Sequence, residues 1–179
     1  MKKLEKLAVF TITPVALIGW AFFGYTELRA NQTQPAPIVQ QRRPEVSDFP
    51  ISELVKATND KRAENGLAPL TENPLLDRSA QNKCNDMIAK NYWSHNSPDG
   101  AEPWVFIQDS GYKYTKAGEN LGFGFKDTNG VMDGWMKSQT HRNNIVSADY
   151  KEVGFGVCSS ENYQGSYSVV IVQHFGKPQ

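Results

Sequence analysis

Three side chains suited to acid–base or metal chemistry lie in one part of the sequence: His95, Glu119 and His141. The chain has three histidines in all, so two of them near a candidate carboxylate stand out. Imidazole nitrogens transfer protons near neutral pH and bind divalent metals. Two imidazoles and one carboxylate would give a metal such as zinc three ligands and an open position. We therefore predict one cleft formed by these residues, with His95 and His141 as candidate metal ligands.

A polar cleft without a metal is the competing interpretation. Glu119 would act as a general base if burial beside a histidine raised its pKa. Alternatively, its carboxylate would accept backbone N–H groups and fix the surrounding glycine-rich segment, while His95 and His141 would orient loops. The sequence contains no nucleophile elbow and no HExxH pattern, so the question of enzymatic activity stays open. His174 lies in a strand-like run and is predicted to be a packing residue.

Composition restricts the partners and the covalent framework. The chain has 19 basic and 19 acidic residues and no run of Lys or Arg, which argues against nucleic acid as a partner. Cys84 and Cys158 permit one internal disulfide. The alternatives are a disulfide, which export would favour, and two reduced cysteines.

The N-terminal segment predicts export. Lys2, Lys3 and Lys6 precede an uncharged apolar run over residues 7–25, long enough to cross a bilayer core of about 30 Å at about 1.5 Å per residue. Residues 1–29 are therefore either a membrane anchor or a cleaved signal peptide. We favour the anchor, because Leu28 and Arg29 make a poor cleavage site before Ala30. Residues 30–47 form a Pro/Gln-rich linker, and residues 48–179 form one domain.

Apolar spacing in the first half of this domain predicts helices. One helix begins at Ile51 and stops at Asn65-Gly66, where Gly tolerates a left-handed cap. A second begins at Asn73-Pro74, because Asn caps a helix well and Pro suits the first helical position. It is expected to end near Asn91. Shorter helices are predicted to begin near residues 102–103 and 127–128.

The C-terminal part has the alternating pattern of strands. Residues 153–157 and 167–175 are predicted strands, with a hairpin connection within residues 161–165. Residues 112–125 are irregular or strand-like. Gly154 and Gly156 share one strand face and indicate that another element approaches closely there. These patterns predict an α+β domain in which helices are layered on a small antiparallel sheet.

A series of short motifs resembles the CAP superfamily, or SCP domain. This superfamily includes cysteine-rich secretory proteins, antigen 5 proteins, plant pathogenesis-related proteins and many exported bacterial proteins. The similarity covers about residues 51–176 and implies an α-β-α sandwich around a small central antiparallel sheet. In order, the motifs are Asn59-x-x-Arg62, Gly66-Leu67-x-Pro69-Leu70, Ser94-His95, Gly118-Glu119-Asn120-Leu121, Trp135-x-x-Ser138, His141-Arg142-x-Asn144-Ile145 and Val153-Gly154-x-Gly156.

The resemblance also implies a cleft. Family members line it with two histidines and two glutamates, and some bind a divalent metal there. The motifs map the first histidine to His95, one glutamate to Glu119 and the second histidine to His141. The second glutamate follows a tryptophan by three residues, a position that Ser138 occupies here. The chain is therefore similar to the bacterial branch, with Ser138 replacing that glutamate.

Three functions remain as hypotheses. The first is a binding or interaction module, outside the cytoplasmic membrane, for a lipid, a glycan or an envelope protein. The second is a metal-dependent hydrolase or protease that uses His95, Glu119 and His141. The third is a structural role in the cell envelope, with the linker setting the distance from the membrane. All three place the domain outside the cytoplasm, either anchored to the membrane or secreted.

Overall fold

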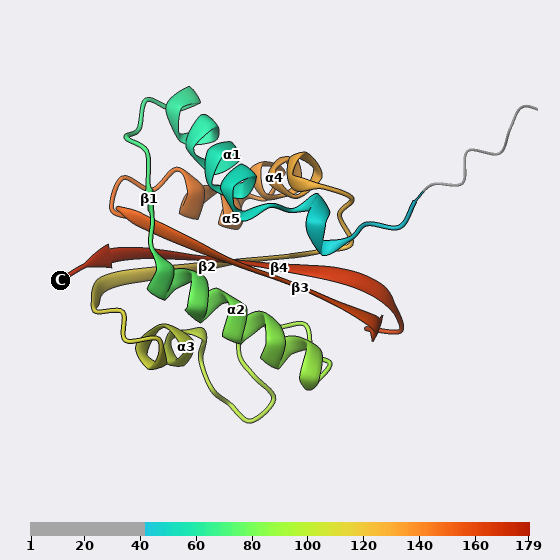
Figure 1. Ribbon diagram of the computed structural model, residues 1–179. Coiled ribbons are helices and arrows are strands. Elements are labelled where there is room, and N and C mark those ends of the chain that lie inside the picture. Colours follow the sequence, from blue (N-terminus) through green and yellow to red (C-terminus); the bar gives the residue numbers. More distant parts are fainter. Residues whose placement is uncertain (1–41) are drawn as a thin grey trace, which may run out of the picture. The chain divides into compact units, whose positions relative to one another are not determined.

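A computed structural model describes residues 42–179 (Figure 1). The predicted anchor or signal peptide, and most of the predicted linker, lie outside the described residues. Within residues 42–179, no helix is both long and apolar enough to cross a membrane.

The described part of the chain contains both helices and strands. In order, the elements are η1 (Val46–Asp48), α1 (Ile51–Glu64), β1 (Thr71–Glu72), α2 (Pro74–Ala89), α3 (Pro103–Asp109), β2 (Tyr114–Phe123), α4 (Thr128–Lys137), α5 (Gln139–Ile145), β3 (Glu152–Tyr163) and β4 (Ser166–Pro178).

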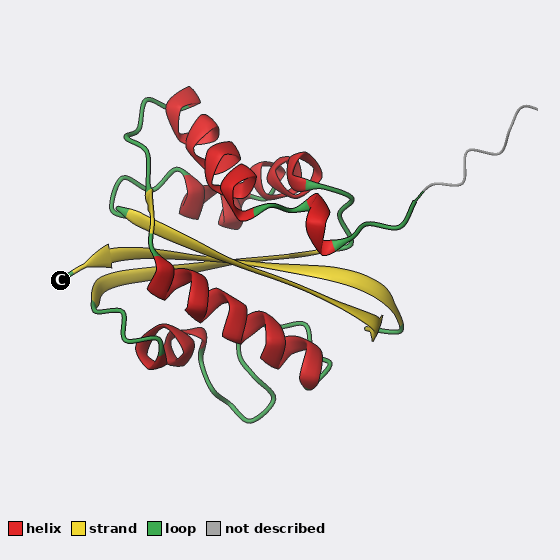
Figure 2. Cartoon of the chain, viewed as in Figure 1, coloured by secondary structure: helices red, strands yellow, loops and turns green. Residues whose placement is uncertain are grey.

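The four strands form one sheet in the order β1-β3-β4-β2. Strand β4 pairs antiparallel with both β3 and β2, whereas the two residues of β1 pair parallel with β3. Helices α1, α4 and α5 cover one face of the sheet, and α2 and α3 cover the other (Figures 1 and 2). The predicted mixed fold with three layers is therefore confirmed. The prediction of a purely antiparallel sheet is wrong, because β1 pairs parallel with β3. Nothing in the sequence indicated β1, since a strand of two residues is too short to show an alternating pattern.

Helix α2 begins and packs as the sequence predicts. The Asn73 side chain accepts the N–H of Leu75 at 2.9 Å, and Pro74 occupies the first helical position. An added Cβ at Gly154 would lie 2.3 Å from the backbone N of Asp77, far inside the contact distance of real atoms. A Cβ at Gly156 would meet the α2 backbone equally closely. These glycines therefore let α2 lie directly on β3.

A disulfide joins the same two elements. Cys84 of α2 is bonded to Cys158 of β3, with Cα atoms 6.1 Å apart. The structure thus decides between the two alternatives that the sequence left open. The bond ties one helical layer to the central sheet.

Helix α5 was not predicted, because its polar residues show no amphipathic period. The buried guanidinium of Arg62 holds the end of this helix. Its Nη1 donates to the carbonyl of Ile145 at 2.8 Å and to that of Ser147 at 2.7 Å. Carbonyls at a helix C-terminus lack intrahelical partners, so a buried cation stabilises them. Ile145 itself is fully buried.

Candidate functional site

The alternation of strand β2 sends two neighbouring side chains to opposite faces of the sheet. Glu119 is paired in register with His174 of β4, and Asn120 with Gln173. Successive residues of a strand face opposite sides, so each pair starts a separate polar cluster. The Glu119 cluster lies on the α2 side, and the Asn120 cluster lies on the α1 side.

The Glu119 carboxylate is shared by two histidines. Its Oε1 lies 2.6 Å from His95 Nδ1, and its Oε2 lies 3.0 Å from His174 Nε2. A carboxylate only accepts hydrogen bonds, so both ring N–H groups donate to it. Burial alone would raise the pKa of Glu119, but the hydrogen bonds from His174 and His95, together with the charges of His174 and Lys83, lower it. Glu119 is thus held ionised by imidazoles rather than by backbone N–H groups, which disfavours the predicted general-base role.

His174 is buried, as predicted for a packing residue, but its ring also makes hydrogen bonds that the prediction did not include. The side chain is completely buried, and Nδ1 lies 2.7 Å from the hydroxyl of Ser79 on α2. Both ring nitrogens are therefore used, one for Ser79 and one for Glu119. The alternating pattern of the strand predicts only that His174 faces the core. It does not show that Glu119 of β2 lies opposite. The adjacent polar pair Gln173-His174, within the otherwise apolar segment from Val169 to Phe175, was the available signal.

His95 is the exposed member of the cluster. Its side chain is 55% exposed, whereas that of Glu119 is 1% exposed. Because Nδ1 donates to Glu119, the lone pair of the neutral ring lies on Nε2 and is available to a ligand. This arrangement presents one oriented imidazole to the outside.

A buried lysine fixes the loop that carries His95. Lys83 of α2 is fully buried, and its Nζ donates to the carbonyls of His95 at 2.6 Å and Ser94 at 3.2 Å, and to the Tyr92 hydroxyl at 3.0 Å. Burial lowers the pKa of Lys83, while the negative charges of Glu119 and Asp86 act in the opposite direction. Lys83 belongs to no sequence motif. A lysine is usually exposed, so its place on the buried face of α2 was not expected.

A cleft of about 310 Å³ opens beside this imidazole. Its walls include His95, Glu119, Trp104, Asn144 and Tyr150. Trp104 is partly exposed on this wall. The cleft therefore combines aromatic surface with hydrogen-bonding groups.

The second polar cluster attaches α5 to the sheet. Asn120 Nδ2 donates to the Gln173 side chain at 3.0 Å and to the backbone carbonyl of His141 at 3.2 Å. Asn144 donates to Asn120 Oδ1 at 2.8 Å and to the Glu119 carbonyl at 3.1 Å. Gln173 in turn donates to Thr58 of α1 at 3.0 Å. These bonds hold the helix that carries His141.

His141 and Ser138 stand apart from the shared carboxylate. Burial lowers the pKa of His141, and the nearby His95 imidazole lowers it further when it carries a proton. In residues 42–179, however, no hydrogen bond joins the His141 ring to His95 or Glu119. Ser138 lies at the junction of α4 and α5, where its hydroxyl contacts that of Thr140 at 3.2 Å. The structure thus brings His95 and Glu119 into contact, with His141 nearby.

The described side chains around the cleft do not form a complete metal site. Across the described residues, no group of three or more His, Cys, Asp or Glu is arranged to hold a metal ion. Both Glu119 oxygens and His95 Nδ1 are already hydrogen-bonded, which leaves the Nε2 of His95 and the ring of His141. These groups do not fit a site with three protein ligands, and the zinc site stays a prediction.

Comparisons with known proteins identify one family. The model of the cysteine-rich secretory protein family, CAP, matches residues 55–175. The uncharacterised protein YkwD of Bacillus subtilis (strain 168) is 33% identical over 153 residues, which cover 82% of this chain and 57% of that protein. The uncharacterised membrane protein YlbC of the same organism is 25% identical over 129 residues, covering 72% of this chain and 37% of that protein.

A solved structure shares the fold. An extracellular protein containing a SCP domain from Bacillus anthracis has a TM-score of 0.61 and 26% identity, covering 71% of this chain and 40% of that chain. This chain thus spans little more than half of YkwD and less than half of the other two relatives.

Proposed function

Because the chain belongs to the cysteine-rich secretory protein (CAP) family, we propose that it is a binding module that acts outside the cytoplasmic membrane. The disulfide between Cys84 and Cys158 supports this location, since such bonds persist in oxidising compartments. The names of two relatives, a membrane protein and an extracellular protein, agree with it. The N-terminal apolar run would attach the domain to the membrane or direct its secretion.

One observation carries the binding role: the oriented, half-exposed imidazole of His95 at the cleft of about 310 Å³. Ligand sites combine apolar walls with a few well-placed polar groups. Trp104 offers aromatic surface here, and the exposed ring of His95 offers a hydrogen bond. A glycan, which has apolar ring faces and many hydroxyl groups, matches this mixture better than a purely apolar lipid chain.

Two features support recognition over catalysis. The Glu119 carboxylate is committed to two imidazoles and its pKa is lowered, so it is a weak base. Ser138 stands where the family resemblance implies a second glutamate, so that carboxylate is missing, and the other carboxylate on the cleft wall is the exposed Glu102. What remains is a rigid arrangement that can orient a ligand.

Calorimetry on the full chain tests the binding role. We expect saturable binding of a soluble β-linked N-acetylglucosamine oligomer, weakened about tenfold by His95→Ala through loss of a hydrogen bond. The matched control is Asn162→Ala, which removes an exposed polar group on the β3–β4 hairpin. Equal affinity in the wild type and His95→Ala would place any binding elsewhere. Binding to phosphatidylglycerol vesicles alone would favour a lipid ligand instead.

A zinc titration distinguishes the binding role from the metal-dependent hydrolase. The proposed binding role predicts no tight zinc site that depends on His95 and His141. Tight binding lost in the double variant His95→Ala/His141→Ala, with the fold retained by circular dichroism, would replace the binding role by the metal-dependent hydrolase. Affinity unchanged by the double variant would leave the binding role in place.

A further inference from the structure

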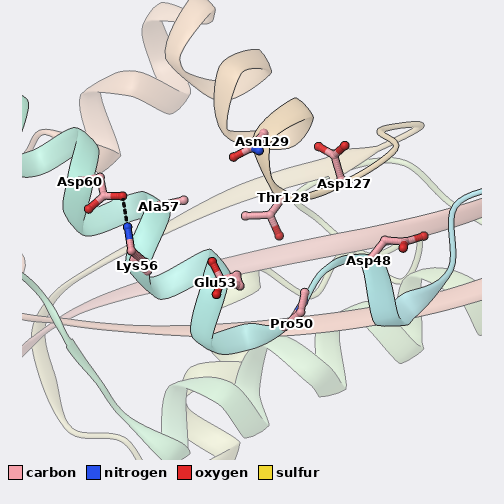
Figure 3. Close-up of a pocket in the computed structure, with 9 residues that line it drawn as sticks. All are labelled: Asp48, Pro50, Glu53, Lys56, Ala57, Asp60, Asp127, Thr128 and Asn129. Atoms are coloured by element: carbon pink, nitrogen blue, oxygen red, sulfur yellow. Dashed lines mark hydrogen bonds and ion pairs between the residues drawn. The ribbon is translucent and has the colours of Figure 1, made fainter.

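A second pocket, with no lining residue in common with the cleft, lies between α1 and α4. Its volume is about 330 Å³, and it is bounded by the segment from Asp48 to Asp60 and by the start of α4 (Figure 3). This volume is in the lower part of the range of small-molecule sites. None of the residues that define the sequence motifs lines this pocket.

An unpaired hydroxyl faces this pocket. Thr128, the first residue of α4, is 8% exposed, and its Oγ1 is the one buried side-chain polar atom in residues 42–179 without a hydrogen-bond partner. Figure 3 shows the hydroxyl pointing from α4 toward the first turn of α1, where Pro50 and Glu53 lie. A buried polar group without a partner destabilises the fold, and a hydrogen bond to a molecule from outside the chain would remove that cost.

The charge of the lining selects the sign of that partner. Four lining residues are acidic, namely Asp48, Glu53, Asp60 and Asp127, and Lys56 is the basic one. A concave surface dominated by one sign of charge attracts the opposite sign. The pocket therefore favours a cation.

Glu53 is the carboxylate that is available to the cation. The other three already accept hydrogen bonds, from Arg42, from Lys56 at 2.7 Å and from the backbone N–H of Gly130 at 2.8 Å. Within the described range, no hydrogen bond or ion pair engages the Glu53 carboxylate, although its charge acts on the nearby Lys56 and helps to raise the pKa of that ammonium. Its carboxylate lies on the α1 side, facing the same space as Thr128 (Figure 3).

We propose that this pocket binds a primary ammonium group between the Glu53 carboxylate and the Thr128 hydroxyl. An ammonium has three N–H donors, and both of these groups have oxygen acceptors to meet them. A metal ion fits less well, because the described residues include no cluster of three carboxylate or imidazole ligands. The ammonium belongs either to a small diamine or to a lysine side chain of a peptide, and the two sources share this chemistry.

Ligand titrations on the full chain distinguish recognition of the N–H donors of an ammonium group from attraction of any positive charge. The probes are cadaverine, Nα-acetyl-lysine methylamide and tetramethylammonium. Their binding is measured by calorimetry and by the amide NMR shifts of Thr128 and Asn129. We expect saturable binding of at least one primary amine, and binding of tetramethylammonium about tenfold weaker because it lacks N–H donors. The tighter of the two amines identifies the source. Equal binding of tetramethylammonium would overturn the proposal.

Variants then test the two acceptors. Thr128→Val keeps the shape but removes the hydroxyl, so the fold is expected to be as stable as the wild type or more stable while amine affinity falls about tenfold. Glu53→Gln is expected to weaken the amine similarly. Asp109→Asn, an exposed change of the same charge on α3, is the control and is expected to leave the affinity unchanged. Wild-type affinity in both Thr128→Val and Glu53→Gln would overturn the proposal and leave water as the partner of the hydroxyl.

Discussion

Glu119 shows how one side chain can couple two layers of the molecule. Its carboxylate joins the exposed His95 to the buried His174, and His174 continues the contact to Ser79 on α2. A ligand that touches His95 therefore contacts a side chain whose orientation is fixed from inside the sheet. Such support from behind is what keeps a binding group in one geometry.

Replacing Glu119 by Gln tests this arrangement through its pH dependence. The amide cannot accept from both imidazoles, and we expect a loss of about 3 kcal/mol in the free energy of unfolding at pH 7. The folded-state pKa of Glu119 is lowered, so its stabilisation is complete above the ordinary glutamate pKa, near 4.3, and is lost as the pH falls through the lowered value. The difference between wild type and variant is therefore expected to shrink below about pH 4.

Urea unfolding of both proteins from pH 7 to pH 3 measures this difference. Glu64→Gln, an exposed carboxylate on α1, controls for the loss of one charge. A difference that stays constant into the acid range would contradict the assignment of Glu119 as an ionised acceptor.

At the scale of elements, the contact between α2 and β3 depends on the absence of two side chains. A Cβ at Gly156 would lie 2.3 Å from the backbone of Ala80, so Gly156→Ala forces the helix and strand apart. We expect a loss of about 2 kcal/mol or more in the free energy of unfolding. At Gly130 an added Cβ would lie 3.6 Å from Asp127 Oδ1, an ordinary contact, so Gly130→Ala is the matched control and is expected to be neutral or stabilising. Similar unfolding midpoints for the two variants would count against the close packing.

The elements with strong local signals could be predicted from the sequence. Asn73-Pro74 marks the start of α2, Gly154 and Gly156 mark the helix contact, and alternation marks β3 and β4. These features depend on residues that are neighbours in the sequence. They also place the site motifs on the right parts of the fold.

The remaining elements depend on distant partners. Helix α5 is held at its end by Arg62 of α1, and its six polar residues show no periodicity of their own. The role of His174 depends on the register between β2 and β4, which places it opposite Glu119. Register and long-range hydrogen bonds leave no local pattern, and for that reason the pairing of His174 with Glu119 was missed.

At the scale of the whole molecule, the disulfide is the covalent link between layers. Cys84 and Cys158 are separated by 74 positions in the sequence, and cross-links that close long loops restrict the unfolded chain strongly. We expect Cys84→Ala/Cys158→Ala to lower the free energy of unfolding by about 2–4 kcal/mol. Denaturant unfolding with and without dithiothreitol checks this, since the reductant is expected to destabilise the wild type and leave the double variant unchanged. A wild type insensitive to reductant under denaturing conditions would contradict it.

The same bond has a consequence for a protein that meets proteases. His95, Glu119 and His141 all lie between the two cysteines in the sequence. A single peptide-bond cut anywhere from Cys84 to Cys158 would yield two chains that stay joined through sulfur. The nicked protein would migrate as one species until it is reduced, and neither fragment could diffuse away from the other.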